Sequence, residues 1–258
     1  MATPLLDWHP HLGRIGGKDL RTWLADYPPI TAPTRSIMLA TEERSGSEFL
    51  CQALGATGQL GRPSEYLNTY WMRRFIPDYP DAVAAQMAIA HRVGTTLNGC
   101  FAMKLHTVQL DRLLTGSRVE ASFPNLVFVR LYRRDLLDQA ISLYRARYSS
   151  QYHAHVPQER AVDFNSAAIR TAMIELARSR ARWEVYFARN AVQPLAIAYE
   201  DLARDPIATV RAIARHADIP VVPREVAAPL SVQHDALSDA WRQRYLDECG
   251  DLNLLDDI

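Results

Sequence analysis

Short apolar runs followed by polar loops recur along the chain and predict an alternation of strands and helices. Residues 37–40 form an apolar run that ends in a polar, glycine-containing loop at 41–48. Apolar residues between 49 and 54 then recur at helical spacing until Gly55 interrupts the pattern. Strand, loop and helix therefore follow one another in the order of a βα unit.

Three more apolar runs predict strands at 100–105, 126–131 and 195–199. Enough chain separates them for intervening helices, which favours an α/β fold with a mostly parallel central sheet and helices on both faces. The chain of 258 residues suits one domain of this kind. We therefore predict a single domain over 34–258.

Two helices and an N-terminal arm complete this prediction. Apolar residues recur every three or four positions over 167–190, which predicts a long helix with one buried apolar stripe. Arg180 interrupts this stripe. Asp205 and Pro206 provide an N-cap and a first-turn proline for a helix to about 217. Residues 1–33 contain eight glycines and prolines, which predicts an irregular arm whose two tryptophans, Trp8 and Trp23, dock on the domain.

The composition restricts the classes of partner. Lys plus Arg and Asp plus Glu balance at 29 each, so no global basic field attracts nucleic acid or an anionic membrane. The sequence lacks a cationic start with an apolar core and any membrane-length apolar run, so we expect a soluble, cytoplasmic protein.

Neither cysteine nor histidine spacing indicates a metal. The three cysteines, Cys51, Cys100 and Cys249, form no C-x-x-C pair and no disulfide framework. His153 and His155 form a lone H-x-H in a polar segment without further ligands. We therefore expect no metal site.

The polar loop after the first strand predicts an anion site. Arg44, Ser45, Gly46 and Ser47 lie between a buried strand and a helix start, where free N–H groups and the helix dipole favour phosphate. No G-x-x-x-x-G-K-[ST] motif is present, and no lysine is placed to clamp the β and γ phosphates of ATP. The loop therefore argues against an ATPase.

A second cationic cluster follows the strand predicted at 126–131. Arg133 and Arg134 lie at its carboxyl end, and Ser142 lies about two turns into the next helix, so an arginine and a hydroxyl can converge on a second phosphate. The arginines could equally pair with Asp135 and Asp138. Two phosphate sites at two strand ends suit a nucleotide phosphorylated at its 5′ and 3′ positions.

These motifs, in this order, resemble the bacterial carbohydrate sulfotransferases that depend on 3′-phosphoadenosine 5′-phosphosulfate (PAPS) and are typified by trehalose 2-sulfotransferase. The resemblance implies a P-loop-like sulfotransferase fold and transfer of a sulfuryl group from PAPS to a hydroxyl of a carbohydrate or glycolipid. The matching stretches are LATEERSGS (39–47), GRPSEY (61–66), MKL (103–105), RRDLLDQAISLYRA (133–146), YEDL (199–202) and WRQRY (241–245).

The resemblance also implies roles for the residues in these motifs. The loop from Arg44 to Ser47 would hold the 5′-phosphosulfate, and Arg133 or Arg134 with Ser142 would hold the 3′-phosphate. Glu65 would act as general base, while Arg44 would stabilise the departing bisphosphate.

We assign Tyr66, Lys104 and His106 to the acceptor side of the site. Lys104 leaves the end of a predicted strand and can reach the sulfuryl oxygens or the acceptor. Tyr66, with Tyr70 and Trp71, could form a platform for a sugar ring or belong to the core, and both interpretations stay open. We expect 66–98 and 107–123 to build the acceptor pocket.

Several alternatives stay open at this point. Glu42, Glu43 and Glu48 flank the predicted anion loop and should weaken binding unless they point away or pair with arginines. One alternative is therefore a catalytically impaired nucleotide-binding protein on the same fold. Another is a kinase-like phosphoryl transferase, although the loop lacks its lysine. A third is an interaction module that uses the N-terminal arm, for example as a homodimer. Arg145 and Arg147 are expected on a solvated face.

Overall fold

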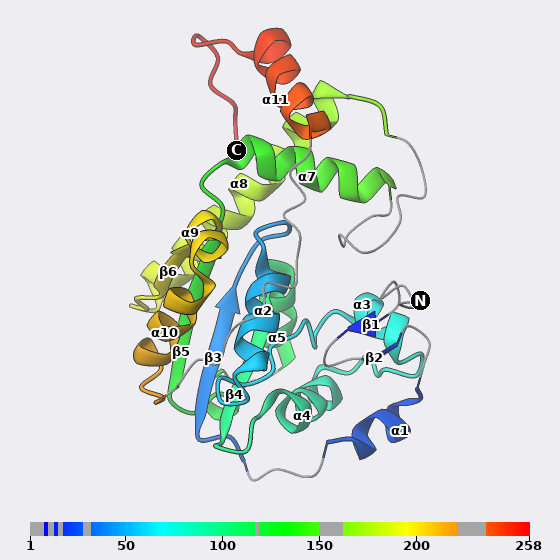
Figure 1. Ribbon diagram of the computed structural model, residues 1–258, viewed down its shortest axis with the longest axis vertical. Helices are drawn as coiled ribbons and strands as arrows, with labels where there is room; N and C mark the ends of the chain where they lie inside the picture. Colours follow the sequence, from blue (N-terminus) through cyan, green and yellow to red (C-terminus); the bar gives the residue numbers. More distant parts are fainter. Residues whose placement is uncertain are drawn as a thin grey trace.

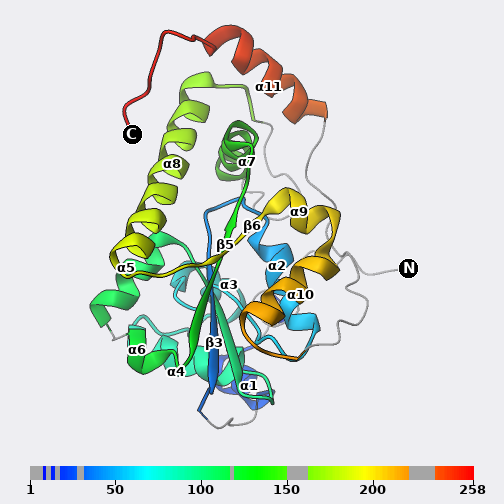
Figure 2. The same cartoon turned by 90° about the vertical axis from the view of Figure 1, so that its left-hand side faces the viewer.

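A computed structural model describes residues 8–9, 13–14, 18–27, 32–116, 119–149, 162–220 and 236–258. At its centre lies a four-stranded parallel sheet, which Figures 1 and 2 show from two sides. The strands, in the spatial order β4-β3-β5-β6, are β4 (Cys100–Leu105), β3 (Arg35–Ala40), β5 (Leu126–Tyr132) and β6 (Leu195–Ala198). All four predicted strands are confirmed.

Helices occupy most of the remaining described chain. A two-stranded antiparallel ribbon of β1 (Trp8–His9) and β2 (Gly13–Arg14) precedes them. The helices are α1 (Leu20–Ala25), α2 (Ser47–Ala56), α3 (Thr69–Phe75), α4 (Val83–Gly94), α5 (Thr107–Gly116), α6 (Val119–Ser122), α7 (Leu136–Ser149), α8 (Ser166–Arg189), α9 (Tyr199–Arg204), α10 (Pro206–His216) and α11 (Ala236–Cys249).

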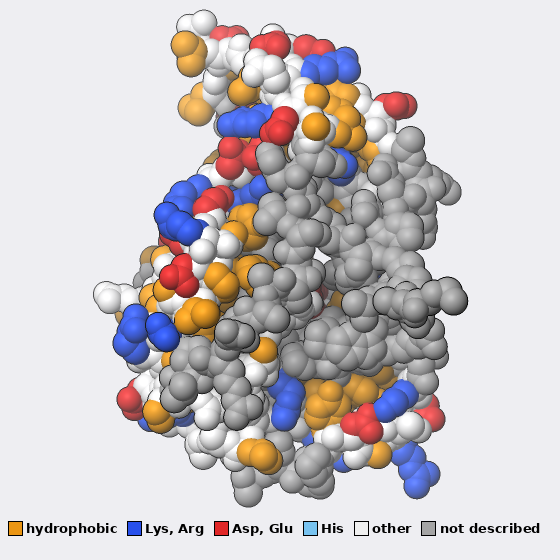
Figure 3. Space-filling model, in the orientation of Figure 1, with side chains coloured by type: hydrophobic (Ala, Val, Ile, Leu, Met, Phe, Trp, Pro, Cys, Tyr) orange, Lys and Arg blue, Asp and Glu red, His pale blue; other side chains and the backbone are white. Residues whose placement is uncertain are grey.

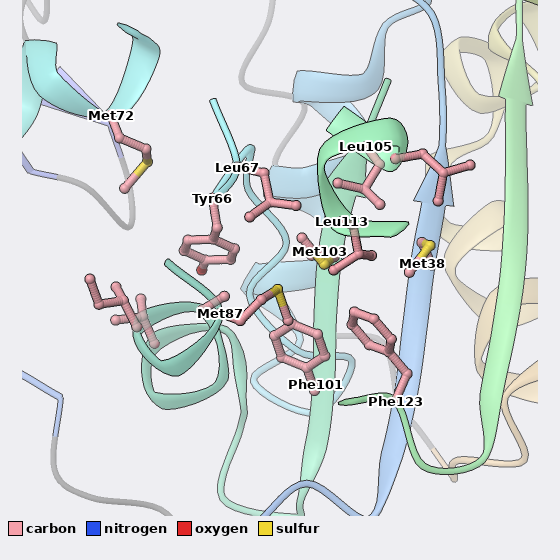
Figure 4. Close-up of a cluster of buried hydrophobic side chains, with 14 of the residues drawn as sticks. Met38, Tyr66, Leu67, Met72, Met87, Phe101, Met103, Leu105, Leu113 and Phe123 are labelled. Atoms are coloured by element: carbon pink, nitrogen blue, oxygen red, sulfur yellow. The ribbon is translucent and has the colours of Figure 1, made fainter. Parts of the chain in front are cut away.

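Both faces of the sheet are buried, because successive strand residues point to opposite sides. Met38 and Ala40 face a core shared with α3, α4, α5 and α8, part of which Figure 4 shows. Ile37 and Leu39 face a second core shared with α2, α9 and α10. Since both faces are covered, the strands need continuous apolar runs, which is why the sequence pattern revealed them. The predicted α/β fold with helices on both faces is confirmed.

A third apolar cluster lies above the carboxyl ends of the strands, where α7, α8 and α11 pack together (Figure 2). Trp241 of α11 packs against Tyr144 of α7, with ring centroids 5.8 Å apart. Arg242 pairs with Asp135 and Asp138 at the start of α7. This cluster holds α7 over the end of the sheet where the predicted phosphate sites lie.

The predicted helix boundaries agree with the capping groups. Asn165 caps α8 by accepting a hydrogen bond from the Ala168 N–H, and Asp205 caps α10 through the Ala208 N–H. Pro206 occupies the first turn of α10 as expected. The sequence therefore located both helices to within one residue.

The N-terminal region is more regular than its glycine and proline content predicted. Asp19 accepts a hydrogen bond from the Thr22 N–H and starts α1, so the expected irregular arm is wrong for residues 20–25. Trp23 is only 2% exposed and packs in the core, as expected, whereas the side chain of Trp8 lies outside the described residues. A short capped helix with one buried tryptophan therefore fixes this part of the chain.

The strand order creates a crevice at the carboxyl end of the sheet. From β3 the chain passes first to β4 on one side, and β5 then pairs on the opposite side of β3. The connections after β3 and β5 therefore diverge, and open α/β sheets bind ligands at such switch points.

Candidate active site

One cavity of about 1130 Å³ lies at this switch point. It is bounded by the donor loop, which we define as residues 42–47, and by segments from α3, α5, α7, α8 and α9. The predicted site residues that line it are Arg44, Gly46, Ser47, Glu65, Lys104, His106, Arg133 and Ser142. Ser45, Tyr66 and Arg134 are not among its lining residues.

The backbone of the donor loop turns sharply before α2. Arg44 and Gly46 have positive φ angles of 59° and 80°, and α2 begins at Ser47. A Cβ atom at Gly46 would collide with the ring of Tyr199, so only glycine fits here. Ser45 is buried, and its hydroxyl donates to the Glu42 carbonyl at 2.8 Å. Ser45 therefore shapes the loop from within.

The two predicted phosphate elements meet in the structure. The Nε of Arg44 in the donor loop donates a 3.0 Å hydrogen bond to the Oγ of Ser142 on α7. These residues are 98 positions apart in the sequence. The chain thus brings a guanidinium, a hydroxyl and the N-terminus of α2 to one end of the cavity.

The adjacent arginines after β5 point to different places. The guanidinium of Arg133 lines the cavity and lies 5.2 Å from the ring centroid of Tyr199. Arg134 instead forms an ion pair with Asp201 of α9. Asp135 and Asp138 pair with Arg242, so the expected alternative in which they pair with the two arginines is wrong. Of the two arginines, only Arg133 therefore lies where a ligand in the cavity can contact it.

The acidic residues of the donor loop are matched by cations. Glu42 is buried and pairs with Arg130 on β5. The carboxylate of Glu43 lies 3.0 Å from Arg147, whose other guanidinium nitrogen pairs with Glu175. Arg130 and Arg147 thus supply partners for two of the three carboxylates that the sequence left open. The third, Glu48, lines the cavity with its carboxylate 4.0 Å from Lys104 Nζ.

Glu65 is held by a convergent set of donors from three chain segments. Its Oε1 lies 2.6 Å from Lys104 Nζ and 3.4 Å from His106 Nε2. Its Oε2 accepts hydrogen bonds from Asn68 Nδ2 at 2.6 Å and Gln109 Nε2 at 2.9 Å. A carboxylate that receives this many donors is fixed in one orientation.

The surroundings of Glu65 and Lys104 determine the charge states of the two side chains. Burial opposes ionisation of Glu65, but Lys104 and His106 outweigh burial and hold the pKa of the carboxyl well below its ordinary value. Burial likewise opposes the charged form of Lys104, yet Glu65 holds the pKa of the ammonium above its ordinary value. The side chain of Glu65 is only 14% exposed and that of Lys104 only 7%, so the two form a nearly buried ion pair.

His106 joins Glu65 to the donor loop. Its Nδ1 lies 3.2 Å from both the hydroxyl and the carbonyl oxygen of Thr41, the residue just before the loop. The indole Nε1 of Trp183 donates to the same carbonyl at 3.1 Å. His106 therefore links Glu65 to the end of β3.

Tyr66 belongs to the core, which corrects its assignment to the acceptor site. Its side chain is fully buried, and its hydroxyl donates to the Arg62 carbonyl at 2.6 Å. Figure 4 shows its ring among the buried side chains. Tyr70 and Trp71, by contrast, line the cavity, and Tyr70 is 82% exposed. Of the predicted aromatic platform, only these two reach the cavity.

The sequence missed the contribution of α8 to the cavity wall. Of the expected ranges 66–98 and 107–123, only residues 67–71, Arg74, residues 107–109 and Arg112 line the cavity. Glu175, Arg178, Ser179 and Arg182 of α8 also line it. These four polar residues lie between the buried apolar residues of α8 in the sequence. The apolar spacing alone indicates only that α8 packs on a core. A polar face opposite that stripe was the available signal.

The expected solvated face at the end of α7 holds for Arg147, which is exposed, but not for Arg145, which is partly buried. Arg147 lines the cavity with its two carboxylate partners. Arg145 donates to Ser238 Oγ at 2.6 Å and lies 5.9 Å from the ring centroid of Trp241. Both side chains connect α7 to other elements.

Other features of the described residues bear on the remaining expectations. They contain no cluster of three or more His, Cys, Asp or Glu arranged for a metal, while His153 and His155 lie outside them. Within the described segments, no helix combines the length and apolar content that a bilayer crossing requires. On the face shown in Figure 3, the basic and acidic side chains that are described are interspersed.

Two curated proteins are similar to this chain in sequence. Trehalose 2-sulfotransferase of Mycobacterium tuberculosis (strain ATCC 35801 / TMC 107 / Erdman) is 29% identical over 84% of this chain and 96% of its own length. Trehalose 2-sulfotransferase of Mycolicibacterium smegmatis (strain ATCC 700084 / mc(2)155) is 26% identical over 83% of this chain and 94% of its length.

Two solved structures are also similar. The sulfotransferase domain from the curacin biosynthetic pathway aligns with a TM-score of 0.48 and 17% identity, and covers 84% of this chain and 98% of the domain. The corresponding domain of the Synechococcus PCC 7002 olefin synthase aligns with a TM-score of 0.42, also at 17% identity, and covers 84% and 90%.

The family match extends over most of the chain. The family model for the Stf0 sulphotransferases matches residues 36–248, a range that contains the donor loop, Glu65 and Lys104, and both arginines after β5. The protein therefore belongs to the Stf0 sulphotransferase family and is an enzyme that transfers sulfate.

Proposed function

We propose that the enzyme takes the sulfuryl group from PAPS and transfers it to a hydroxyl of a carbohydrate acceptor. The observation that carries this proposal is the hydrogen bond from Arg44 to Ser142, which joins two anion-binding elements at one end of the cavity. A donor with phosphates at its 5′ and 3′ positions matches two such elements.

The donor loop and the N-terminus of α2 would hold the 5′-phosphosulfate. The free N–H groups at the start of α2 and the guanidinium of Arg44 face the cavity there. Arg133 and Ser142 would hold the 3′-phosphate from the other side. Arg44 would also stabilise the negative charge that develops on the bridging oxygen as the bond from sulfur to that oxygen breaks.

Glu65 would accept the proton of the acceptor hydroxyl. In the free protein its low pKa makes it a weak base, because Lys104 neutralises it. A bound donor offers Lys104 a second anionic partner in the sulfuryl oxygens, which weakens the hold of Lys104 on Glu65 and raises the basicity of Glu65. The acceptor oxygen then bonds to sulfur, its proton moves to Glu65, and adenosine 3′,5′-bisphosphate leaves.

The acceptor would lie between Glu65 and the wall formed by α3 and α5. Tyr70 and Trp71 on this wall follow Glu65 closely in the sequence and line the cavity. Aromatic rings of this kind stack on the apolar faces of sugars. Since both curated relatives are named trehalose 2-sulfotransferases, we propose trehalose as the first acceptor to test.

Calorimetric titration tests the donor and a transfer assay tests the chemistry. Adenosine 3′,5′-bisphosphate should bind more tightly than 5′-AMP or ATP. With PAPS and trehalose, the wild type should form a sulfated sugar. Glu65→Gln should retain bisphosphate binding and lose transfer by about 100-fold or more, as expected for a general base.

Each result has a distinct meaning. Equal affinity for the bisphosphate and 5′-AMP would refute the second phosphate site. Unchanged turnover in Glu65→Gln would remove Glu65 from the reaction. Sulfation of other sugars but not trehalose would keep the reaction and replace the acceptor.

A further inference from the structure

One turn of α8, residues 179–183, contacts several of the segments that build the cavity. Ser179 Oγ lies 3.2 Å from the hydroxyl of Thr107 at the start of α5. Trp183 donates to the Thr41 carbonyl, just before the donor loop. Between these residues lies Arg180, whose charge interrupts an otherwise apolar stripe. This turn therefore holds the donor-loop side and the α5 side of the cavity together.

Arg180 reaches the backbone of the second phosphate element. Its Nη2 donates to the carbonyl oxygen of Arg133 at 2.5 Å and to Oε1 of Gln139 at 2.7 Å. Arg133 is the cavity-lining arginine after β5, so this hydrogen bond fixes the main chain that carries its side chain. Arg180 itself does not line the cavity.

Gln139 extends the contact to the donor loop. This fully buried glutamine accepts from Arg180 through Oε1, and its Nε2 donates to the carbonyl of Glu43 at 2.7 Å. A continuous chain of hydrogen bonds therefore runs from the Arg133 carbonyl through Arg180 and Gln139 to Glu43. Its two ends lie in the two elements assigned to the 3′-phosphate and the 5′-phosphosulfate.

The energetics of Arg180 argue against a purely structural role. No described carboxylate lies within ion-pair distance of its guanidinium, and its buried Nε has no hydrogen-bond partner in the described chain. Arg180 is half-buried, and placing its charge on two neutral acceptors costs stability that Glu42 and Glu200 offset only from beyond ion-pair distance, whereas an apolar residue would continue the stripe at lower cost. The arginine fits this position because the planar guanidinium directs the two N–H groups of Nη2 to two acceptors at a fixed angle.

We propose that Arg180 is a positioning residue that sets the spacing between the two phosphate sites and thereby the selectivity for a 3′-phosphorylated nucleotide. This inference rests on the proposed donor. Without these hydrogen bonds, the main chain at Arg133 loses its anchor to α8 and Gln139, so the 3′-phosphate loses its ligand geometry, while the 5′ site persists because the hydrogen bonds from Arg44 to Ser142 and from Gln139 to Glu43 remain.

The test compares affinities for adenosine 3′,5′-bisphosphate and 5′-AMP by calorimetry. Arg180→Met should reduce the preference for the bisphosphate about tenfold, as expected when hydrogen bonds of a charged group are lost. Its affinity for 5′-AMP should change less than about threefold. Arg180→Lys, which can donate to the Arg133 carbonyl but lacks the planar guanidinium, should recover part of the preference for the bisphosphate over 5′-AMP. Arg189→Met, at the exposed end of α8, is the matched control and should behave as wild type.

Gln139→Glu tests the other half of the chain of hydrogen bonds. The new carboxylate still accepts from Arg180 but cannot donate to the Glu43 carbonyl. This variant should therefore weaken binding of the bisphosphate and of 5′-AMP together, because the donor loop loses an anchor while the Arg133 segment keeps one. The result for Gln139→Glu stands by itself and does not depend on whether Arg180→Met folds well.

The outcomes separate this inference from the proposed function. No preference for the bisphosphate in the wild type would refute the donor assignment itself. If the wild type clearly prefers the bisphosphate over 5′-AMP and both Arg180→Met and Arg180→Lys keep this preference, the role of Arg180 is overturned but the donor assignment is not. Parallel loss of 5′-AMP and bisphosphate binding in both Arg180 variants would also overturn it, since that pattern indicates a general structural role.

Discussion

The ion pair between Glu65 and Lys104 allows a quantitative test of the site. Lys104→Met removes the ammonium that lies 2.6 Å from Oε1 of Glu65 and leaves a carboxylate that is only 14% exposed. Removing one partner of a buried ion pair costs about 3–5 kcal/mol. The lower end applies here, because Asn68 and Gln109 still donate to the carboxylate. We expect a loss of about 3 kcal/mol in the free energy of unfolding at neutral pH.

The loss should depend on pH in a defined direction. In the wild type, the pKa of Glu65 is held below its ordinary value of 4.5, so its stabilising contribution is present above pH 4.5 and disappears as the pH falls through the folded-state pKa. In Lys104→Met, burial is no longer opposed by the ammonium and the pKa of Glu65 rises. The carboxylate then protonates in mild acid, so the difference between wild type and variant should shrink below about pH 4.5.

Urea denaturation at neutral pH and at about pH 4 measures both effects. Lys18→Met is the control, because Lys18 pairs with Asp26 on the surface and should cost less than about 1 kcal/mol at either pH. The double variant Lys104→Met with Glu65→Gln should be more stable than Lys104→Met alone at neutral pH, since it leaves no unpaired buried charge. A loss for Lys104→Met as small as the control, or one that grows on acidification, would refute the reasoning.

The remaining predictions concern the anion-binding end of the cavity. Gly46→Ala should weaken bisphosphate binding at least about tenfold in calorimetry, because its positive φ and the ring of Tyr199 leave no room for a Cβ atom; wild-type affinity would show that the loop relaxes freely. Arg133→Met should reduce the preference for the bisphosphate over 5′-AMP by about tenfold, whereas Arg134→Met, which loses only the surface pair with Asp201, should change it less than about twofold. The reverse order of effects would assign the 3′-phosphate to Arg134.

The local pattern of the sequence determined the scaffold of this protein. Four apolar runs marked the strands because each is buried on both faces and must be apolar throughout. Asp205 and Pro206 marked a helix start because capping acts within one turn. The donor loop was recognisable for the same reason, since a glycine between a buried strand and a helix start is a local feature.

The tertiary structure decided which charged and aromatic side chains belong to the site. Arg133 and Arg134 are equivalent in sequence, and only the position of α9, which carries Asp201, separates them. Tyr66 and Tyr70 lie one helical turn apart, yet one is core and the other is exposed to the cavity.

Glu65 shows most clearly why the sequence predicted the scaffold but not the environment of the site residues. One donor, Asn68, lies three residues away, but Lys104, His106 and Gln109 lie about 40 residues further along the chain, a distance that no periodicity encodes. Burial of an apolar stripe is specified by spacing within one element, whereas the charge state of a carboxylate depends on which cations the fold brings within a few ångströms. The sequence by itself therefore determined the strands, several of the helices and the loop between β3 and α2, and only the packed chain determined the environment of Glu65.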